Sequence, residues 1–354
     1  MSEPARRLLV VAGGTRATAS TRHRLWNYRP YLEREGVRLD WIEYTGGRIE
    51  SAAAALSARL RFLWDLGRHA LAKDVVLVQK VLPPIPLVHR WRRAGARVVY
   101  DFDDALYERF EWGESEAEAA QRRKRFDAML GAASHVLAGS PPLAEYARRL
   151  HPRVDVFYPS LDRARFDALP ARGAGEGPVI GWVGNDQSQV YLRALAPVLA
   201  AAMERHPTMR LRICSSRLPD LPSLPADRVE LVPWSEAGEL EAVASFDLAV
   251  SPLASDAWSQ ARGGRVSVLL SLAAGVPVIA APGGGLEELV AASGQSAPGL
   301  LFARTAQEWE ARLGELLADG GERKRRGAAA RALVDQSIWA DVQWPRFRAA
   351  VLGS

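Results

Sequence analysis

The sequence has 354 residues, of which 48% are hydrophobic and 25% charged, and 46 basic against 41 acidic residues give a formal net charge of +5. Its length predicts about two globular domains. The mild charge does not indicate nucleic-acid binding, although a basic balance suits an anionic substrate or a peripheral contact with an anionic membrane. The single cysteine, Cys214, excludes an intrachain disulfide and any multi-cysteine metal site. We see neither a hydrophobic signal core nor an apolar run of about 20 residues, so we expect a cytoplasmic protein.

Short apolar runs alternate with longer segments of helical spacing through about 160 residues, a pattern typical of a doubly wound parallel sheet. The predicted strands cover 6–14, 37–44, 74–80, 96–104, 135–140 and 154–162. The predicted helices between them cover 21–34, 51–72, 86–94, 114–133 and 142–150. We therefore predict an α/β fold for the first half of the chain.

A segment rich in Gly, Pro and Ala, 168–178, lacks apolar periodicity and is the best candidate for a linker. After it the alternation restarts, and the tail at 322–352 is predicted to be helical with a break near Ser337 or Pro345. The predicted strands cover 179–185, 209–216, 229–234, 246–253 and 276–282, and the predicted helices cover 191–205, 237–244, 266–275, 286–290 and 305–318. The predicted organisation is an N-terminal domain at 1–170, a second domain at 178–335 and a C-terminal helix at 336–354 that crosses back to the first domain.

The stretch from Phe246 to Val290 carries the clearest binding signal. A buried strand is followed by a polar loop with two glycines, 254–264, and then by a helix, and Arg262 and Arg265 stand just before the N-terminus of that helix. Ligands of parallel sheets bind at the carboxyl ends of the strands, and helix N-termini favour anions. The stretch therefore predicts a phosphate-bearing ligand. An ordinary βαβ unit with solvated arginines is the alternative.

Five segments, in this order, carry a resemblance to a known family. They are DVVLVQKVLPP at 74–84, ARVVYDFDDALYERF at 96–110, PWSEAGELEAVASFDLAVSPLASDAW at 233–258, LAAGVPVIAAPGG at 272–284 and QEW at 307–309. Together they resemble the GT-B glycosyltransferases of the retaining family 4, also described as glycosyl transferases group 1. The resemblance implies two Rossmann-like doubly wound domains facing across a cleft. It also implies a nucleotide sugar as the donor substrate and no metal or other cofactor.

The chain departs from the family's pattern at the expected donor site. Arg262 and Leu270 stand where the family often carries two glutamates eight residues apart. Related branches keep a lysine in this loop, and Arg262, Arg265 or Ser267 stands in for it here. Three interpretations are open. Another residue holds the donor, the protein uses an unusual donor, or the protein is a degenerate homologue of the family.

On the donor side, the resemblance implies that the second domain binds the nucleotide and its diphosphate, with UDP, GDP or dTDP as the nucleotide. Trp234 either lines the pocket of the base or is an aromatic residue at the domain edge, and Trp182, inside a predicted strand, is expected in the core. The residues expected to bind the donor are Gly184, Asn185, Trp234, Arg262, Gly263, Gly264, Arg265, Ser267, Gly283, Gly284, Gly285 and Glu288.

The loop after the first predicted strand is a second candidate for binding. Its residues Gly13, Gly14 and Thr15 let the backbone approach a diphosphate or an acceptor closely. A plain βα turn is the alternative, and a nicotinamide cofactor is a weak one because the loop is not a GxGxxG fingerprint. Arg22 and Arg24 follow on the next predicted helix and face either the cleft or solvent.

The DFDD motif places Asp101, Asp103 and Asp104 at the carboxyl end of a predicted strand. Alternation along the strand predicts Asp101 and Asp103 on one side and Asp104 on the other. The resemblance implies a histidine in many family members about where Asp103 stands. We expect Asp103, with Asp101 beside it, to accept the proton of the acceptor hydroxyl or to bond the sugar. Helix capping and a DxD-like metal site are the alternatives, and the resemblance favours a metal-independent site.

These residues predict a glycosyltransferase that moves a sugar from a nucleotide-sugar donor to an acceptor hydroxyl, with retention. The product would be a polysaccharide or other glycan, a lipid-linked glycan or a glycosylated metabolite. Two alternatives stay open: a non-catalytic homologue that binds a sugar nucleotide or a glycan, and a sugar-nucleotide epimerase of the same fold.

Overall fold

The computed structural model describes residues 6–44, 52–69, 72–110, 114–170, 177–296 and 298–353. The chain divides into two compact units. Unit 1 comprises Met1–Leu161, Ala261–Gly264 and Ala340–Ser354, and unit 2 comprises Asp162–Gln260 and Arg265–Trp339. A short piece of the second half of the sequence, Ala261–Gly264, therefore belongs to unit 1.

Unit 1 is built on six parallel strands in the order β2-β1-β3-β4-β5-β6. The strands are β1 (Arg7–Ala12), β2 (Arg38–Glu43), β3 (Val75–Gln79), β4 (Arg97–Phe102), β5 (His135–Ala138) and β6 (Val154–Val156). From β1 the chain moves to β2 at one edge of the sheet. It then crosses to β3 on the other side of β1 and continues outward through β4, β5 and β6. The point where the direction reverses, between β1 and β3, is where open α/β sheets bind ligands.

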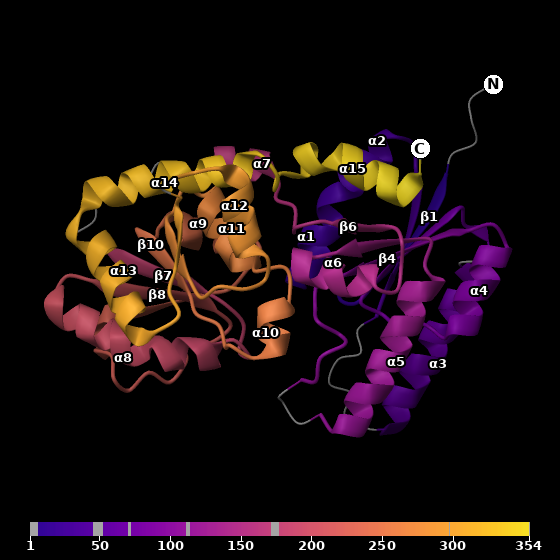
Figure 1. The fold of residues 1–354 in the computed structure, drawn as a ribbon, viewed down its shortest axis with the longest axis horizontal. Coiled ribbons are helices and arrows are strands. Elements are labelled where there is room, and N and C mark those ends of the chain that lie inside the picture. The colour runs from indigo at the N-terminus through magenta and orange to yellow at the C-terminus, as the bar shows by residue number, and fades with distance from the viewer. Residues whose placement is uncertain are drawn as a thin grey trace. The chain divides into compact units, whose positions relative to one another are not determined.

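Helices cover both faces of this sheet. Each right-handed crossover places its helix on one face or the other, depending on the direction in which the connection runs along the sheet. They are α1 (Ala19–Arg24), α2 (Arg29–Arg34), α3 (Ala52–His69), α4 (Ile85–Arg93), α5 (Glu116–Ala132), α6 (Pro141–Arg148) and α15 (Ala340–Leu352), with a short 3-10 helix η1 at Trp26–Tyr28. One buried cluster joins Leu8 and Val10 of β1 to Leu25, Phe347 and Val351. The C-terminal helix α15 therefore closes the core against the first strand, and Figure 1 shows this yellow helix beside the indigo α2 and β1.

Unit 2 also has six parallel strands, in the order β12-β11-β10-β7-β8-β9. Counted from β7, this is the strand order of the dinucleotide-binding fold, with its switch point between β7 and β10. The strands are β7 (Val179–Val183), β8 (Arg210–Ser215), β9 (Val229–Pro233), β10 (Leu248–Ser251), β11 (Val278–Ala280) and β12 (Leu300–Phe302). Its helices are α7 (Arg163–Asp167), α8 (Gln189–Arg205), η3 (Ala226–Arg228), α9 (Gly238–Ala244), α10 (Ala257–Ala261), α11 (Val266–Ala273), α12 (Leu286–Ser293), α13 (Ala306–Ala318) and α14 (Gly320–Asp335).

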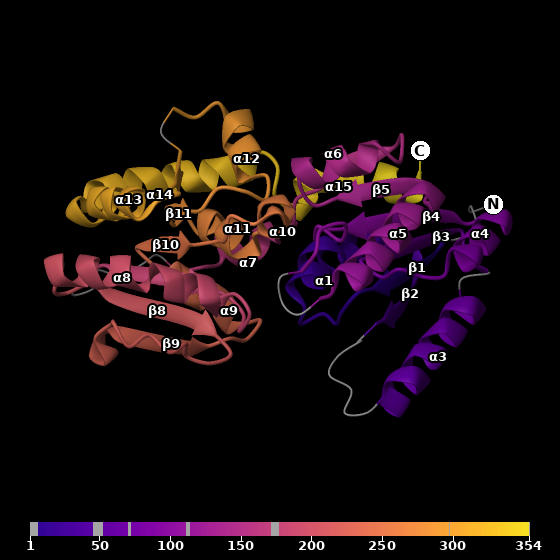
Figure 2. The same ribbon diagram turned by 60° about the horizontal axis from the view of Figure 1, so that its bottom comes forward.

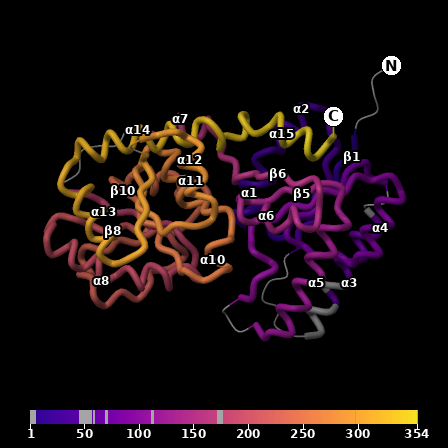
Figure 3. Tube along the Cα trace, viewed as in Figure 1, coloured from indigo at the N-terminus to yellow at the C-terminus, as the bar shows by residue number. Residues whose placement is uncertain are grey.

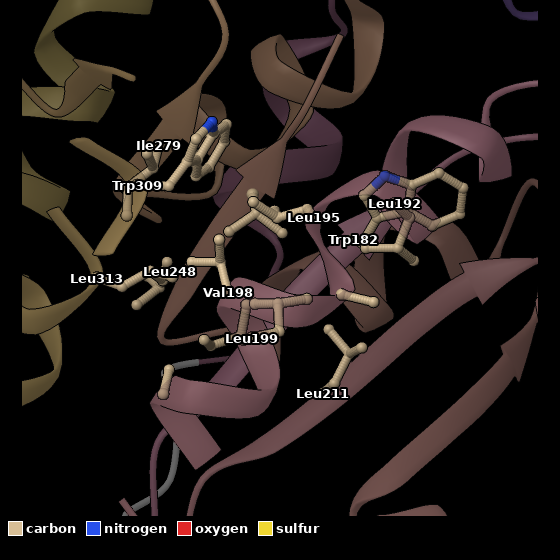
Figure 4. Close-up of a cluster of buried hydrophobic side chains, with 14 of the residues drawn as sticks. Trp182, Leu192, Leu195, Val198, Leu199, Leu211, Leu248, Ile279, Trp309 and Leu313 are labelled. Carbon is tan, nitrogen blue, oxygen red and sulfur yellow. The ribbon is translucent and has the colours of Figure 1, made fainter. Parts of the chain in front are cut away.

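The core of unit 2 lies between its sheet and helices α8 and α13. Figure 4 shows Trp182 of β7 and Trp309 of α13 on opposite sides of Leu195 and Val198 of α8. Trp182 is 3% exposed, as expected for a core residue. Figure 2 shows α8 lying along β8, and Figure 3 shows α13 beside α14.

The structure differs from the sequence prediction at short elements. The three-residue strand β12 was not predicted, α10 lies inside the predicted polar loop, and α7 precedes the predicted linker at 168–178. Segments this short carry too little periodicity for recognition. Helix α15 continues through Pro345, so the break lies only at 336–339. A proline removes one helical hydrogen bond, and the buried contacts of Phe347 and Val351 hold the helix on the sheet.

Candidate functional site

The switch point of unit 1 brings Gly13, after β1, against Lys80, after β3. A Cβ atom on Gly13 would lie 2.9 Å from the Gln79 carbonyl oxygen and 3.1 Å from the Lys80 Cβ, so only glycine fits there. Lys80 itself adopts a left-handed backbone with a φ of 59°. Among the described non-glycine residues, only Lys80 and Arg265 have a positive φ. Its backbone N–H donates to the Asp101 carbonyl oxygen at 2.9 Å. Such a conformation in a lysine is held by its surroundings and points to a functional position.

The side chain of Lys80 joins the two acids that follow β4. Its Nζ lies 3.2 Å from Oδ1 of Asp103 and also contacts Oδ2 of Asp104. The prediction that the two carboxylates point to opposite sides is therefore wrong. Strand β4 ends at Phe102, so the alternation of a strand does not extend to the residues after it.

The environment separates the acidities of the two carboxyl groups. Burial raises the pKa of Asp103, although Lys80 opposes the shift. Burial acts on Asp104 as well, but the charges of Lys80 and Arg262 hold the pKa of Asp104 below its usual range. Burial also opposes the charge of Lys80, and the two aspartates raise the pKa of its ammonium above the usual value. The pair therefore offers one carboxylate suited to take up a proton and one fixed anion.

Asp101 has different partners. It forms a buried ion pair with Arg24, whose Nε lies 2.9 Å from Oδ2 and whose Nη2 lies 2.5 Å from Oδ1, and Gln79 Nε2 donates to Oδ2 at 3.3 Å. The Arg24 and Asp101 side chains are only 1% and 2% exposed, and Arg24 also donates to the Phe157 carbonyl oxygen. The structure thus brings Asp101 to Arg24 and not to Asp103. Its catalytic role stays a prediction, and Arg24 points into the interior of unit 1.

The segment Ala261–Gly264 packs against Asp103 within unit 1. The N–H of Gly263 donates to the Asp103 carbonyl oxygen at 2.8 Å, and the Ser140 hydroxyl donates to the Ala261 carbonyl oxygen at 3.1 Å. A Cβ atom on Gly263 would lie 2.6 Å from the backbone of Gly139. A Cβ atom on Gly264, whose φ is +97, would lie 3.6 Å from Asp103 Oδ2. These two glycines let the loop predicted to bind the diphosphate approach the predicted catalytic carboxylate.

The loop after β1 forms a tight turn before α1. The Thr18 N–H donates to the Thr15 carbonyl oxygen at 2.9 Å, and a Cβ atom on Gly14 would lie 2.5 Å from the Thr18 hydroxyl. Arg22 is 2% exposed and donates to the Ala17 carbonyl oxygen at 3.2 Å. Arg22 therefore lies within the loop instead of in solvent, and ligand binding by Gly14, Thr15 and Arg22 stays a prediction.

In unit 2, Gly184 and Asn185 lie directly after β7, at the switch point. A Cβ atom on Gly184 would lie 2.3 Å from the Trp182 ring, so this glycine is needed for packing. The Asn185 side-chain oxygen accepts from the Ser188 N–H at 3.0 Å, in the turn that leads into α8. Trp234 donates through Nε1 to the buried carboxylate of Glu239 at 2.9 Å. The structure thus gives each of these residues a local partner.

Arg265 ties together the ends of two strands. Its buried guanidinium donates through Nη2 to the carbonyl oxygen and the hydroxyl of Ser251, at 2.9 and 2.8 Å, and through Nη1 to the Ala281 carbonyl oxygen at 3.1 Å. Ser267 lies half-buried in the first turn of α11. These three hydrogen bonds direct the Arg265 guanidinium toward Ser251, at the end of β10, and Ala281, directly after β11. Its contact with a diphosphate stays a prediction.

The glycine turn before α12 consists of Gly283, Gly284 and Gly285, with φ values of 111°, 71° and 79°. Such a run of left-handed residues is accessible only to glycine. The Gly283 N–H donates to the Glu287 carboxylate at 2.8 Å, and the Gly284 N–H donates to the Gln260 carbonyl oxygen at 2.9 Å. Glu287, not the predicted Glu288, therefore contacts the turn, and Glu288 is exposed.

The main charged residues that the sequence analysis missed are Lys80, directly after β3, and Glu239, in the first turn of α9. The signal for Lys80 was its place at the end of an apolar strand, directly before VLPP. The described residues contain no group of three or more His, Cys, Asp or Glu side chains arranged to hold a metal ion. Among the helices that the structure describes, we find none with the length and apolar character needed to cross a membrane.

Comparison with known proteins agrees with this architecture. Residues 177–319 match the family described as "Glycosyl transferases group 1", which confirms the resemblance for that part of the chain. No curated protein sequence matches the chain.

Three solved structures illustrate the similarity in fold. Anabaena Alr3699/HepE in complex with UDP and glucose is 14% identical, with a TM-score of 0.68 over 97% of this chain and 99% of that chain. A glycosyltransferase from Rickettsia africae is 11% identical, with a TM-score of 0.71 over 98% and 97%. A putative UDP-N-acetylglucosamine 2-epimerase from Listeria monocytogenes is 11% identical, with a TM-score of 0.61 over 98% and 96%. The predicted GT-B fold with two Rossmann-like units is confirmed.

Proposed function

We propose that this chain, whose residues 177–319 match the group 1 glycosyltransferases, transfers a sugar from a nucleotide-sugar donor to an acceptor hydroxyl. One observation carries the proposal. The glycine segment Gly263–Gly264, from the loop predicted to bind the diphosphate, packs on Asp103 beside Lys80 and Asp104. A loop predicted to bind an anion therefore lies against a carboxylate with a raised pKa, which supports glycosyl transfer.

In the proposed reaction the bond between the anomeric carbon and the diphosphate oxygen breaks, and a bond from that carbon to the acceptor oxygen forms. Asp103 accepts the proton of the acceptor hydroxyl, while Lys80 and the ionised Asp104 keep the carboxylate in place. Arg262 neutralises charge on the leaving diphosphate. We propose retention at the anomeric carbon on the basis of the resemblance, and no metal ion takes part.

The donor side of the proposal rests on unit 2. Gly184 and Asn185 follow β7 at the switch point, and the glycine turn Gly283–Gly285 lies directly before α12. We propose that these elements bind a nucleoside diphosphate, with Trp234 beside the base. The Anabaena structure in complex with UDP and glucose supports UDP ahead of GDP or dTDP.

The acceptor is proposed to be a small molecule, a lipid-linked acceptor or a glycan. We propose that the protein acts in the cytoplasm and contacts a membrane peripherally. The formal net charge of +5 supports contact with an anionic surface.

Release of a nucleoside diphosphate, measured with and without acceptors for UDP-, GDP- and dTDP-sugars, tests the proposal. Acceptor-dependent release of one diphosphate is the expected result. An epimerase, the second candidate, is favoured by the similarity to the Listeria protein. It would convert the nucleotide sugar with no acceptor. A homologue that only binds would show affinity for the nucleotide without turnover, and either result would contradict glycosyl transfer.

A further inference from the structure

Helix α3 presents an apolar pair on its outer face. Trp64 is 71% exposed and Leu60 is 59% exposed, the two highest values among the large hydrophobic side chains that the structure describes. The two residues are four apart and so lie on the same face of the helix. On the inner face, Leu66 is fully buried and the Phe62 ring lies 4.6 Å from the ring of Tyr44. The inner contacts therefore account for how α3 attaches to unit 1 but leave Leu60 and Trp64 outside.

The outer face of α3 is also basic. Arg61 and Arg68 are exposed and, with Ser57, follow the same helical spacing as the apolar pair. We define the α3 face as Ser57, Leu60, Arg61, Trp64 and Arg68. Asp65 is the one described acid of the helix, and it is half-buried.

Helix α4, on the same side of the sheet, adds basic residues. Helix α4 contains no acidic residue and exposes Arg90 and Arg93. The crossovers β2–α3–β3 and β3–α4–β4 run in the same direction along the sheet, so right-handed connections place both helices on the same side of it. Figures 1 and 2 show α3 and α4 on the same part of unit 1.

We propose that the α3 face docks unit 1 on a bilayer rich in anionic phospholipid. Tryptophan favours the membrane interface because its ring is apolar and its N–H is polar. Leu60 reaches the acyl boundary beside it, and Arg61 and Arg68 bind phosphate groups of the lipids, with Arg90 and Arg93 adding to the attraction. A second copy of the chain is a poorer partner for this face. A stable protein interface buries about 800 Å² on each partner, whereas this face offers two apolar side chains among arginines that would repel those of another copy.

Cosedimentation with vesicles tests this surface. The full chain is mixed with vesicles of phosphatidylglycerol and phosphatidylcholine in equal parts, and with vesicles of phosphatidylcholine alone. We expect binding to the anionic vesicles only, weakening as salt is added. The double variant Leu60→Ala/Trp64→Ala should lower the partition coefficient at least about tenfold. Arg61→Gln/Arg68→Gln should also lower it and should reduce its dependence on salt.

The matched control is Leu218→Ala, which removes an apolar side chain that is 47% exposed in unit 2, beside Arg217. It should bind vesicles like the wild type, and unchanged far-ultraviolet circular dichroism should show that all variants are folded. Wild-type protein that binds neither vesicle, or a Leu60→Ala/Trp64→Ala variant that binds like wild type, would overturn the proposal. So would a wild-type dimer that this variant converts to a monomer. Vesicle binding is read without turnover, so its failure is distinct from failure of the proposed glycosyl transfer.

Discussion

The ammonium of Lys80 lies 3.2 Å from Oδ1 of Asp103, and the same nitrogen contacts Asp104. The contact joins the ends of β3 and β4, which are neighbours in the sheet although the whole of α4 separates them in sequence. It exists because Lys80 leaves β3 with a left-handed backbone and Gly13 leaves room for it. The ion pair therefore makes the charge state of Asp103 depend on a residue of another strand.

Replacement of Asp103 tests its role as the base. Asp103→Asn should slow turnover about 100- to 10,000-fold, because the amide cannot accept the proton of the acceptor hydroxyl. Affinity for the nucleoside diphosphate, measured by calorimetry, should stay near the wild-type value. Asp40→Asn, which changes an exposed acid of β2, is the control and should leave turnover unchanged.

The same assay in EDTA tests the absence of a metal from the reaction. Activity should survive EDTA, because Lys80 already neutralises the carboxylates. Loss of turnover in EDTA with recovery in magnesium or manganese would make the DFDD acids metal ligands. Full activity of Asp103→Asn would instead make the aspartate a structural residue.

Replacement of Lys80 tests the coupling through the pH profile. In the wild type, burial raises the pKa of Asp103, so activity should fall on the acid side as the pH drops through that raised value. Lys80 favours the ionised form, so Lys80→Met should raise the pKa further and move the acid limb of kcat to higher pH. Lys80→Arg keeps the charge and should keep the limb near its wild-type position. If the acid limb does not move in Lys80→Met, Lys80 does not control the protonation of the catalytic carboxylate.

Arg262 and Arg265 are adjacent to the same helix N-terminus but should differ in effect. Arg262→Ala should weaken UDP binding at least about tenfold, since a hydrogen bond to a charged group contributes roughly 1.5–3 kcal/mol. Arg265→Ala removes three hydrogen bonds to Ser251 and Ala281 and should lower the midpoint of thermal unfolding as well. Calorimetry and thermal unfolding measure the two effects, with Arg312→Ala, at an exposed position of α13, as the control. Wild-type affinity in Arg262→Ala would remove this arginine from the donor site.

Gly263 offers a steric test of the packed segment. Gly263→Ala places a Cβ atom 2.6 Å from the Gly139 backbone, so the segment Ala261–Gly264 cannot keep its place beside Asp103. We expect turnover to fall at least about tenfold, because catalytic geometry tolerates little displacement. Gly131→Ala in α5 is the matched control, since a Cβ atom there meets nothing within 4 Å and should leave turnover unchanged. Equal activity of the two variants would show that the segment's position does not matter to the reaction.

The buried pair Arg24–Asp101 should matter to stability. Arg24→Met leaves the Asp101 carboxylate buried without its charge partner, and breaking such a pair costs about 3–5 kcal/mol of unfolding free energy. Arg7–Asp74 is a matched exposed pair of unit 1, with side chains 47% and 44% exposed. Arg7→Met should lose less than about 1 kcal/mol. Urea unfolding measures both, and equal losses in the two variants would show that the buried pair contributes no more to stability than the exposed pair does.

The sequence by itself determined the order of most strands and helices, because each has a local apolar periodicity that its own residues reveal. It also located the acids of DFDD and the glycines of the loops, since both stand where apolar runs stop. Three elements, β12, α7 and α10, were missed because each is short and lies in a segment without a clear apolar period.

Only the tertiary structure decided which of these residues meet. The sequence did not indicate that Lys80 pairs with Asp103 and Asp104, that Arg24 pairs with Asp101, or that Ala261–Gly264 belongs to unit 1. Each of these contacts joins segments that are distant in sequence, and each depends on the register of neighbouring strands and on backbone angles outside the regular elements. Sequence periodicity describes what a segment buries, whereas the partner of a charged side chain at a strand end is set by the packing of the whole sheet.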